Sequence, residues 1–159
     1  MNKLYVAALF TILSFSSTAQ DKAGAYATIG GALLTFDDGF DSIQPKQLFG
    51  RLGYNFNENI GVGFESGFSL IEDDVVGVDF DVSTIFIYLK GSIPLEDGSK
   101  IYGMIGSTNV EITGTASGFS VSADDDDTGM GIGFETSFGL SMDYIIYNDN
   151  DGVDVTALN

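Results

Sequence analysis

The sequence contains no cysteine, no histidine and no tryptophan, and it has two prolines in 159 residues. Without cysteine, neither disulfide bonds nor thiolate–metal bonds can form. Histidine is the most frequent general base and metal ligand, so its absence argues against most hydrolases. Basic residues are scarce too: there are 6 lysines and arginines against 23 acidic residues, and the net charge of −17 would repel a nucleic-acid backbone. We therefore expect no nucleic-acid partner.

The abundant residues are glycine (21), phenylalanine (13) and tyrosine (7). Aromatic residues favour strands, and glycines let neighbouring side chains approach the backbone closely. This composition indicates β structure, and it differs from that of helical or disordered chains. The length suits a single domain.

The first 19 residues have the pattern of a cleaved signal peptide. Lys3 provides a positive start, residues 4–15 form a short apolar stretch, and residues 17–19 are small residues of the kind that a signal peptidase reads. The apolar stretch is shorter than the roughly 20 residues of a membrane-spanning helix. We expect residues 1–19 to be removed and residues 20–159 to form one exported domain.

Beyond residue 20, apolar residues recur at every second position, which is the period of a β-strand. Even positions from 48 to 70 are mostly apolar, whereas the odd positions between them are mostly glycine or charged. The same alternation predicts eight strands, at residues 25–36, 47–56, 60–71, 82–93, 100–113, 128–135, 138–147 and 153–159. Around the start of the fourth segment the apolar residues change from even to odd positions, so we predict a bulge near Ser83. Short and long connections alternate, and most acidic residues fall in or beside the long ones.

The two faces of these strands suit a membrane barrel better than a soluble one. A face of glycine and charge would make a poor hydrophobic core, whereas the apolar face has the chemistry required for contact with lipid. Aromatic residues near strand ends resemble the girdles of such barrels; they are Tyr54, Phe56, Tyr102, Phe138 and Tyr144. A soluble, lipocalin-like ligand-binding barrel, which would bury the apolar face, stays open as an alternative.

Two stretches resemble a known family. "YNFNENIGVGFESGF" (residues 54–68) and "DTGMGIGFETSFGLSMDYIIY" (residues 127–147), the latter followed by "DGVDVTAL", are similar to the small outer-membrane β-barrels of Gram-negative bacteria, the OmpA/OmpX-like, porin-like group. The resemblance implies an all-β fold, an eight-stranded antiparallel up-and-down transmembrane barrel with short periplasmic turns and long external loops. Family members normally end in an aromatic residue. This chain stops at Ala157-Leu158-Asn159, so we expect a truncated last strand, and either a fragment or a barrel that another element must close.

Six charged residues within the predicted strands share the glycine-rich face: Arg51, Glu65, Lys90, Glu111, Glu135 and Asp143. A charge facing lipid at the bilayer midplane costs roughly 2–4 kcal/mol, so we expect these side chains to point into the barrel. There, Arg51 and Lys90 are the available partners for the carboxylates. The resemblance implies the same arrangement, an internal salt-bridge network. The network either fills the lumen or gates a narrow pore, which would prefer cations because carboxylates outnumber bases.

Four consecutive aspartates are weak candidates for binding a divalent cation: Asp124, Asp125, Asp126 and Asp127. Consecutive carboxylates on an extended segment do not converge, so we interpret them as solvated charge at the end of a long loop, residues 114–127. The glycines that follow at 129, 131 and 133 are not a dinucleotide fingerprint, because no βαβ unit surrounds them. We predict no confident metal site and no cofactor.

Taken together, the sequence predicts a non-enzymatic protein of the bacterial outer membrane with a structural or surface-interaction role. Outer-membrane barrels that are enzymes typically depend on a histidine, which this chain lacks. Outer-membrane lipid and lipopolysaccharide are the expected partners, and divalent cations are a further candidate at the acidic external loops. We expect a monomer.

Overall fold

The computed structural model describes residues 14–17, 23–37, 42–43, 46–69, 73–75, 78–116, 119–150 and 153–159. Every regular element in these ranges is a strand. They are β1 (Ser14–Ser17), β2 (Gly24–Asp37), β3 (Ser42–Ile43), β4 (Lys46–Asn55), β5 (Ile60–Ser69), β6 (Asp73–Val75), β7 (Val78–Pro94), β8 (Lys100–Ala116), β9 (Phe119–Glu135), β10 (Leu140–Asn150) and β11 (Val153–Leu158). None of the described residues belongs to a helix able to cross a membrane.

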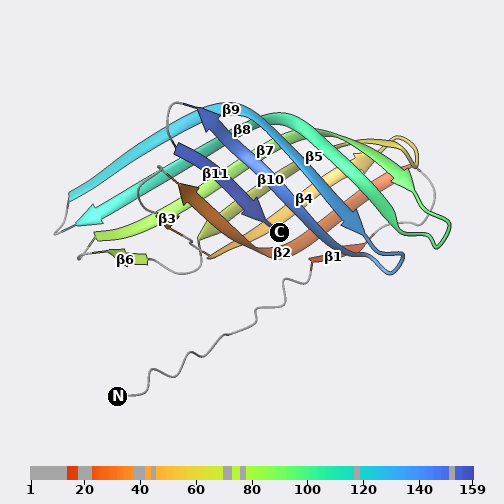
Figure 1. Cartoon of the computed structure of the whole chain (residues 1–159), viewed down its shortest axis with the longest axis horizontal. Coiled ribbons are helices and arrows are strands. Elements are labelled where there is room, and N and C mark those ends of the chain that lie inside the picture. The colour runs from red at the N-terminus through yellow and green to blue at the C-terminus, as the bar shows by residue number, and fades with distance from the viewer. Residues whose placement is uncertain are drawn as a thin grey trace, which may run out of the picture.

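Eight of the strands form a closed antiparallel ring in the order β2, β4, β5, β7, β8, β9, β10 and β11 (Figure 1). β11 closes the ring by pairing with β10 on one side and with β2 on the other, where Leu158 lies opposite Leu33. β1 also lies between β10 and β2, with Phe15 opposite both Leu140 and Ile29. The predicted eight-stranded up-and-down barrel is confirmed.

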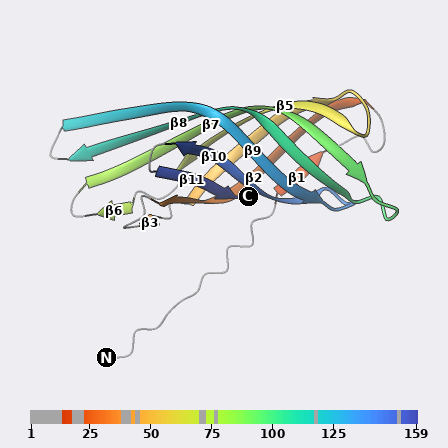
Figure 2. The same cartoon turned by 45° about the horizontal axis from the view of Figure 1, so that its top comes forward.

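The two ends of the barrel differ. At one end, the short-turn end, three tight connections join β4 to β5, β7 to β8 and β9 to β10. Gly98 and Gly139 have φ angles of 82° and 88° in two of these turns, a conformation that side chains with a Cβ rarely adopt. At the opposite, long-connection end, β7, β8 and β9 extend beyond the other strands (Figures 1 and 2).

The aspartate run lies within a strand, which corrects the predicted loop at residues 114–127. β8 continues to Ala116 and β9 already begins at Phe119, so Asp124 lies opposite Glu111 and Asp127 opposite Thr108. The ends of β8 and β9 beyond these residues are rich in threonine and serine, and these side chains pair across the two strands. The Oγ atoms of Thr113 and Ser122, and those of Thr115 and Ser120, are each 3.0 Å apart. Such cross-strand pairs stabilise a hairpin.

The predicted bulge near Ser83 is wrong. β7 pairs with β8 without interruption from Asp79 to Pro94, and Ser83 lies opposite Phe68 of β5 in regular register. The parity change in the sequence has another cause: Val82 points inward, on the same face as Phe86, because part of the barrel interior is apolar. A register shift does occur in β10, between Ile146 and Asn148.

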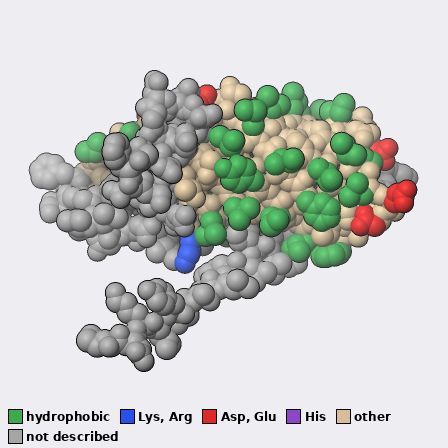
Figure 3. Space-filling model, in the orientation of Figure 1, with side chains coloured by type: hydrophobic (Ala, Val, Ile, Leu, Met, Phe, Trp, Pro, Cys, Tyr) green, Lys and Arg blue, Asp and Glu red, His purple; other side chains and the backbone are tan. Residues whose placement is uncertain are grey.

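The outward face of the strands carries an apolar band (Figure 3). Leu52 is 63% exposed and Ile132 is 62% exposed. A soluble barrel would not expose so many large apolar side chains in one continuous band. Of the aromatic residues expected in girdles, Tyr54, Phe56, Phe138 and Tyr144 are exposed. Tyr102 is the exception, since it is 4% exposed and points into the barrel.

Candidate functional site

Three charged side chains meet inside the barrel and form what we call the interior charge cluster: Arg51, Glu65 and Asp143. β4 and β5 bring Arg51 and Glu65 together, because the two residues are direct register partners. Asp143 comes from β10, across the interior. The three residues are 4%, 0% and 2% exposed. Their inward orientation follows from the strand alternation that turns Leu52 and Phe64 outward.

Arg51 connects the two carboxylates. Its Nη1 and Nη2 atoms donate to Asp143 Oδ2 and Oδ1 at 2.6 and 2.8 Å, and its Nε donates to Glu65 Oε2. The guanidinium also lies 4.8 Å from the ring centroid of Phe49. A bidentate contact of this kind fixes the relative orientation of the two groups in addition to pairing their charges. A lysine could not reproduce it.

Neutral groups satisfy the remaining acceptor capacity of the two carboxylates. The Tyr147 hydroxyl donates to Glu65. The Tyr102 hydroxyl donates to Asp143 Oδ2 at 2.6 Å, and Asn159 Nδ2 donates to Asp143 Oδ1 at 3.0 Å. The single cation is therefore supplemented by uncharged donors, which offsets the desolvation of two buried acids.

Lys90 occupies a neighbouring part of the interior. Its Nζ lies 4.3 Å from the ring centroid of Tyr26 and 5.6 Å from that of Tyr102, close enough for cation–π attraction. Lys90, Tyr26 and Glu135 help to line an interior space of about 10 Å³. A space of roughly 10–15 Å³ holds one water molecule, so the interior is closely filled at this level.

The comparisons with known proteins agree with the barrel fold. Residues 5–158 match the model of a family described as outer membrane protein beta-barrel domain. The chain belongs to this family. Membership places the barrel in the outer membrane and not in solution as a lipocalin-like barrel. Nothing among curated proteins matches the chain significantly.

Solved outer-membrane barrels have a similar fold. Ail, the attachment invasion locus protein of Yersinia pestis, is 18% identical with a TM-score of 0.66, over 87% of this chain and 94% of that one. The N-terminal β-barrel domain of Pseudomonas aeruginosa OprF is 14% identical with a TM-score of 0.58, over 87% and 96%. Neisserial surface protein A is 13% identical with a TM-score of 0.61, over 87% and 94%. At these identities the similarity shows the fold alone.

The structure brings five of the six charged residues predicted for the lumen of this outer-membrane barrel into its interior: Arg51, Glu65, Lys90, Glu135 and Asp143. The placement of Glu111 in the lumen is wrong. On β8 the even-numbered side chains, such as Met104 and Thr108, point inward, so Glu111 points outward and is exposed beside Asp124.

Sequence reasoning missed the neutral donors around the outer-membrane barrel's interior charge cluster. Tyr147 occupies the same face of β10 as Asp143, so the alternation alone could have placed this tyrosine inside. Tyr102, the other tyrosine donor, was expected in an aromatic girdle instead. Asn159 gave no such signal, because its role depends on backbone hydrogen bonds with Asp143, at 2.8 and 2.9 Å.

Close-packed glycines admit the interior tyrosines of the barrel. A Cβ atom on Gly63 would lie 2.4 Å from Cζ of Tyr88, and one on Gly53 would lie 2.3 Å from Cζ of Tyr26. Each ring thus lies directly over a glycine of a neighbouring strand. The hydroxyls of Tyr26 and Tyr88 are 3.0 Å apart, so a hydrogen bond joins the two side chains inside the barrel.

The structure does not bring the weak metal candidates together. These four residues, Asp124, Asp125, Asp126 and Asp127, follow one another along β9 of the protruding sheet. Successive side chains of a strand point to opposite faces, so Asp125 is turned away from both Asp124 and Asp126. Asp125 lies opposite Val110 of β8, and Asp126 Oδ1 accepts a hydrogen bond of 3.0 Å from Asn109 Nδ2. Within the described ranges, no three acidic side chains converge as metal ligands would.

Proposed function

We propose that this chain is a non-enzymatic surface-interaction protein of the outer membrane. In the orientation we propose, the long-connection end faces outward from the cell and the extended β8–β9 hairpin presents the binding surface. The observation that carries this proposal is the edge of β9. Among the residues that the structure describes, β10 pairs with β9 from Met130 to Glu135, so residues 119–129 border β8 on one side and no described strand on the other.

An exposed strand edge can accept a further strand, because main-chain hydrogen bonds supply affinity and alternate side chains supply specificity. The side chains of residues 120–126 are exposed, and side-chain hydrogen bonds to β8 hold this part of the hairpin in register. Asp124 and Asp126 share one face with Glu111. The partner that fits is an extended segment with lysine or arginine at alternate positions.

The charge of this edge distinguishes it from a polyanion site. Ail has been solved in complex with the heparin analogue sucrose octasulfate, which is highly anionic. The acidic run of the present chain would repel such a ligand. We therefore propose that the two related barrels bind partners of opposite charge.

Binding of an alternating lysine–threonine peptide to the refolded barrel in lipid nanodiscs tests the proposal. D124N/D126N removes two acids from the edge, and E96Q/D97N removes two exposed acids from the short-turn end as the matched control. If each lost ion pair contributes about 0.2–1 kcal/mol, D124N/D126N weakens binding about 2- to 30-fold. E96Q/D97N leaves it unchanged.

The same peptide with an N-methyl group on every backbone amide separates strand pairing from charge attraction. It keeps every lysine but has no backbone N–H group on either edge to donate, so its binding falls well below that of the parent peptide. Equal binding of both peptides, or equal losses in the two double variants, would refute docking at the edge of β9.

A narrow cation-preferring pore is the second candidate, because the interior charge cluster spans the lumen from β4 to β10. The interior space of about 10 Å³ beside Lys90 leaves little room for an ion and its water, so the cluster would have to rearrange for conduction. Planar-bilayer recording tests this candidate. A pore gives discrete conductance steps whose cation preference changes in Arg51 or Glu65 variants.

A further inference from the structure

A row of apolar side chains crosses the long-connection end on the inward face of the sheet and reaches β9. The register places Val82 of β7 beside Ile112 of β8, and Ile112 beside Ala123 of β9. Exposure rises along this row: Val82 is buried in the hydrophobic core, Ile112 is half-buried against that core, and Ala123 is exposed. The row therefore leads from the core to a part of β9 that no described strand covers on its other side.

Val121 extends this apolar surface toward the tip of the β8–β9 hairpin. It lies on the same face of β9 as Ala123, because side chains two residues apart along a strand point to the same side. Val121 is 74% exposed, and its register partner on β8 is Gly114, which has no side chain to cover it. We call Val121 and Ala123 the edge apolar pair.

The opposite face of the same segment is acidic. Asp124 and Asp126 follow each other along it, and Glu111 of β8 is the register partner of Asp124. A strand added to β9 would meet both faces in turn, because its successive side chains also point to opposite sides. One set of its side chains would lie beside the carboxylates. The other set would lie beside the edge apolar pair.

We infer that the partner of this edge is an amphipathic strand of another protein, with basic residues beside Asp124 and Asp126 and apolar residues beside the edge apolar pair. The inference rests on the proposed function and adds the chemistry of the positions between the basic residues. Directly opposite side chains of paired strands are in contact, so the partner's apolar residues continue the row that begins in the core and remove apolar surface from water. A second copy of this chain would bring the same carboxylates to the edge and be repelled.

Binding of three peptides to the refolded barrel in lipid nanodiscs tests the inference. The first is the alternating lysine–threonine peptide. The second, the valine peptide, is identical except that two central threonines are valines, which have the same shape but carry a methyl group in place of the hydroxyl. The third has the composition of the second with its lysines and valines in blocks, so that the alternation is lost.

Two variants of the barrel complete the design. V121T/A123S makes the edge apolar pair polar with little change in shape. L95T removes an exposed apolar side chain from the short-turn end and is the matched control. Mobility on unboiled detergent gels verifies that each variant is folded.

We expect the wild type to bind the valine peptide about tenfold more tightly than the threonine peptide, because two methyl groups are buried in place of two hydroxyls. The blocked peptide should bind no more tightly than the threonine peptide. V121T/A123S should reduce the tenfold preference to less than about threefold, whereas L95T should keep it.

Equal binding of the valine and threonine peptides, or an undiminished preference in V121T/A123S, would overturn the inference and leave the proposed docking at β9 intact. Failure of both alternating peptides to bind would refute the proposed function and the inference with it. A wild-type dimer that V121T/A123S converts to a monomer would also overturn the inference, since the edge apolar pair would then contact a second copy of the chain.

Discussion

Replacing Arg51 with methionine isolates the contribution of the interior charge cluster. The substitution keeps much of the side-chain volume over Phe49 but removes the guanidinium that joins β4 to β10. Glu65 and Asp143 then remain buried, at 0% and 2% exposure, without their cation. Tyr147 and Tyr102 still donate hydrogen bonds to them, but neutral donors do not cancel charge.

Breaking a buried ion pair by removing one partner typically costs about 3–5 kcal/mol, because the other charge is left uncompensated. Here one arginine serves two carboxylates, so we expect R51M to fall within that range, or about a hundredfold to several thousandfold in the folding equilibrium. The triple variant R51M/E65Q/D143N removes all three charges. It should recover most of the loss, since no charge of the interior charge cluster remains.

Urea titration of the barrel in detergent micelles measures both effects, with the folded fraction read from the mobility of unboiled samples. The free energy of unfolding follows from the linear dependence on denaturant. A wild-type midpoint for R51M would show that the cluster contributes nothing to stability. A triple variant as unstable as R51M would show that lost packing, and not uncompensated charge, causes the destabilisation.

Two further predictions concern the tyrosines of the interior. G63A should lower the free energy of unfolding by about 1–3 kcal/mol, because its Cβ would lie 2.4 Å from the ring of Tyr88, whereas the control G50A, which meets nothing within 4 Å, should leave it unchanged. Y147F should cost about 1.5–3 kcal/mol, because the hydroxyl donates to a buried carboxylate, whereas Y144F on the lipid-facing side should have a much smaller effect. Urea midpoints measure both pairs, and equal midpoints within a pair would contradict the assignment of the interior contacts.

The period-two alternation predicted the eight strands and the direction in which most side chains point, whereas their closure into a transmembrane barrel was implied by the family resemblance. The inward orientation of Arg51 and Glu65 follows directly, because both lie on the face opposite Leu52 and Phe64. Long runs of alternation average over local exceptions, and the membrane requires the apolar face to be continuous. These two conditions explain why the strands and their two faces were predictable from one sequence.

The outer part of β8 and β9 was not predictable by the same argument. Beyond the membrane no apolar face is required, so the alternation fades and residues 114–127 resembled a polar loop. What extends the hairpin is pairing between residues on different strands, such as Thr113 with Ser122. The error at Glu111 has the same origin, because parity cannot be followed reliably into a segment that lacks an apolar face.

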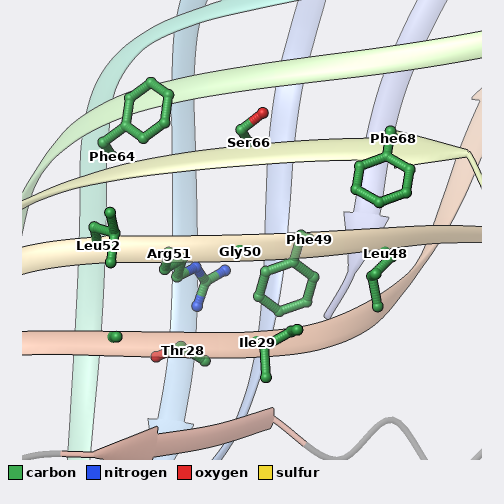
Figure 4. A pocket seen from close by; sticks show the side chains of 11 residues that line it. Thr28, Ile29, Leu48, Phe49, Gly50, Arg51, Leu52, Phe64, Ser66 and Phe68 are labelled. Carbon is green, nitrogen blue, oxygen red and sulfur yellow. The ribbon is translucent and has the colours of Figure 1, made fainter.

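Two glycines of β4 show what the strand register adds to the alternation of side chains. Gly50 and Gly53 stand three residues apart on β4, and parity assigns one to lipid and the other to the lumen. It does not reveal that Gly53 lies under the ring of Tyr26, or that Gly50 lies beside Ser66 in a depression of the apolar band (Figure 4). Both facts depend on which residues of β2 and β5 are neighbours. The packing of Tyr26 requires the inner glycine, whereas a Cβ atom on the outer one would meet nothing within 4 Å.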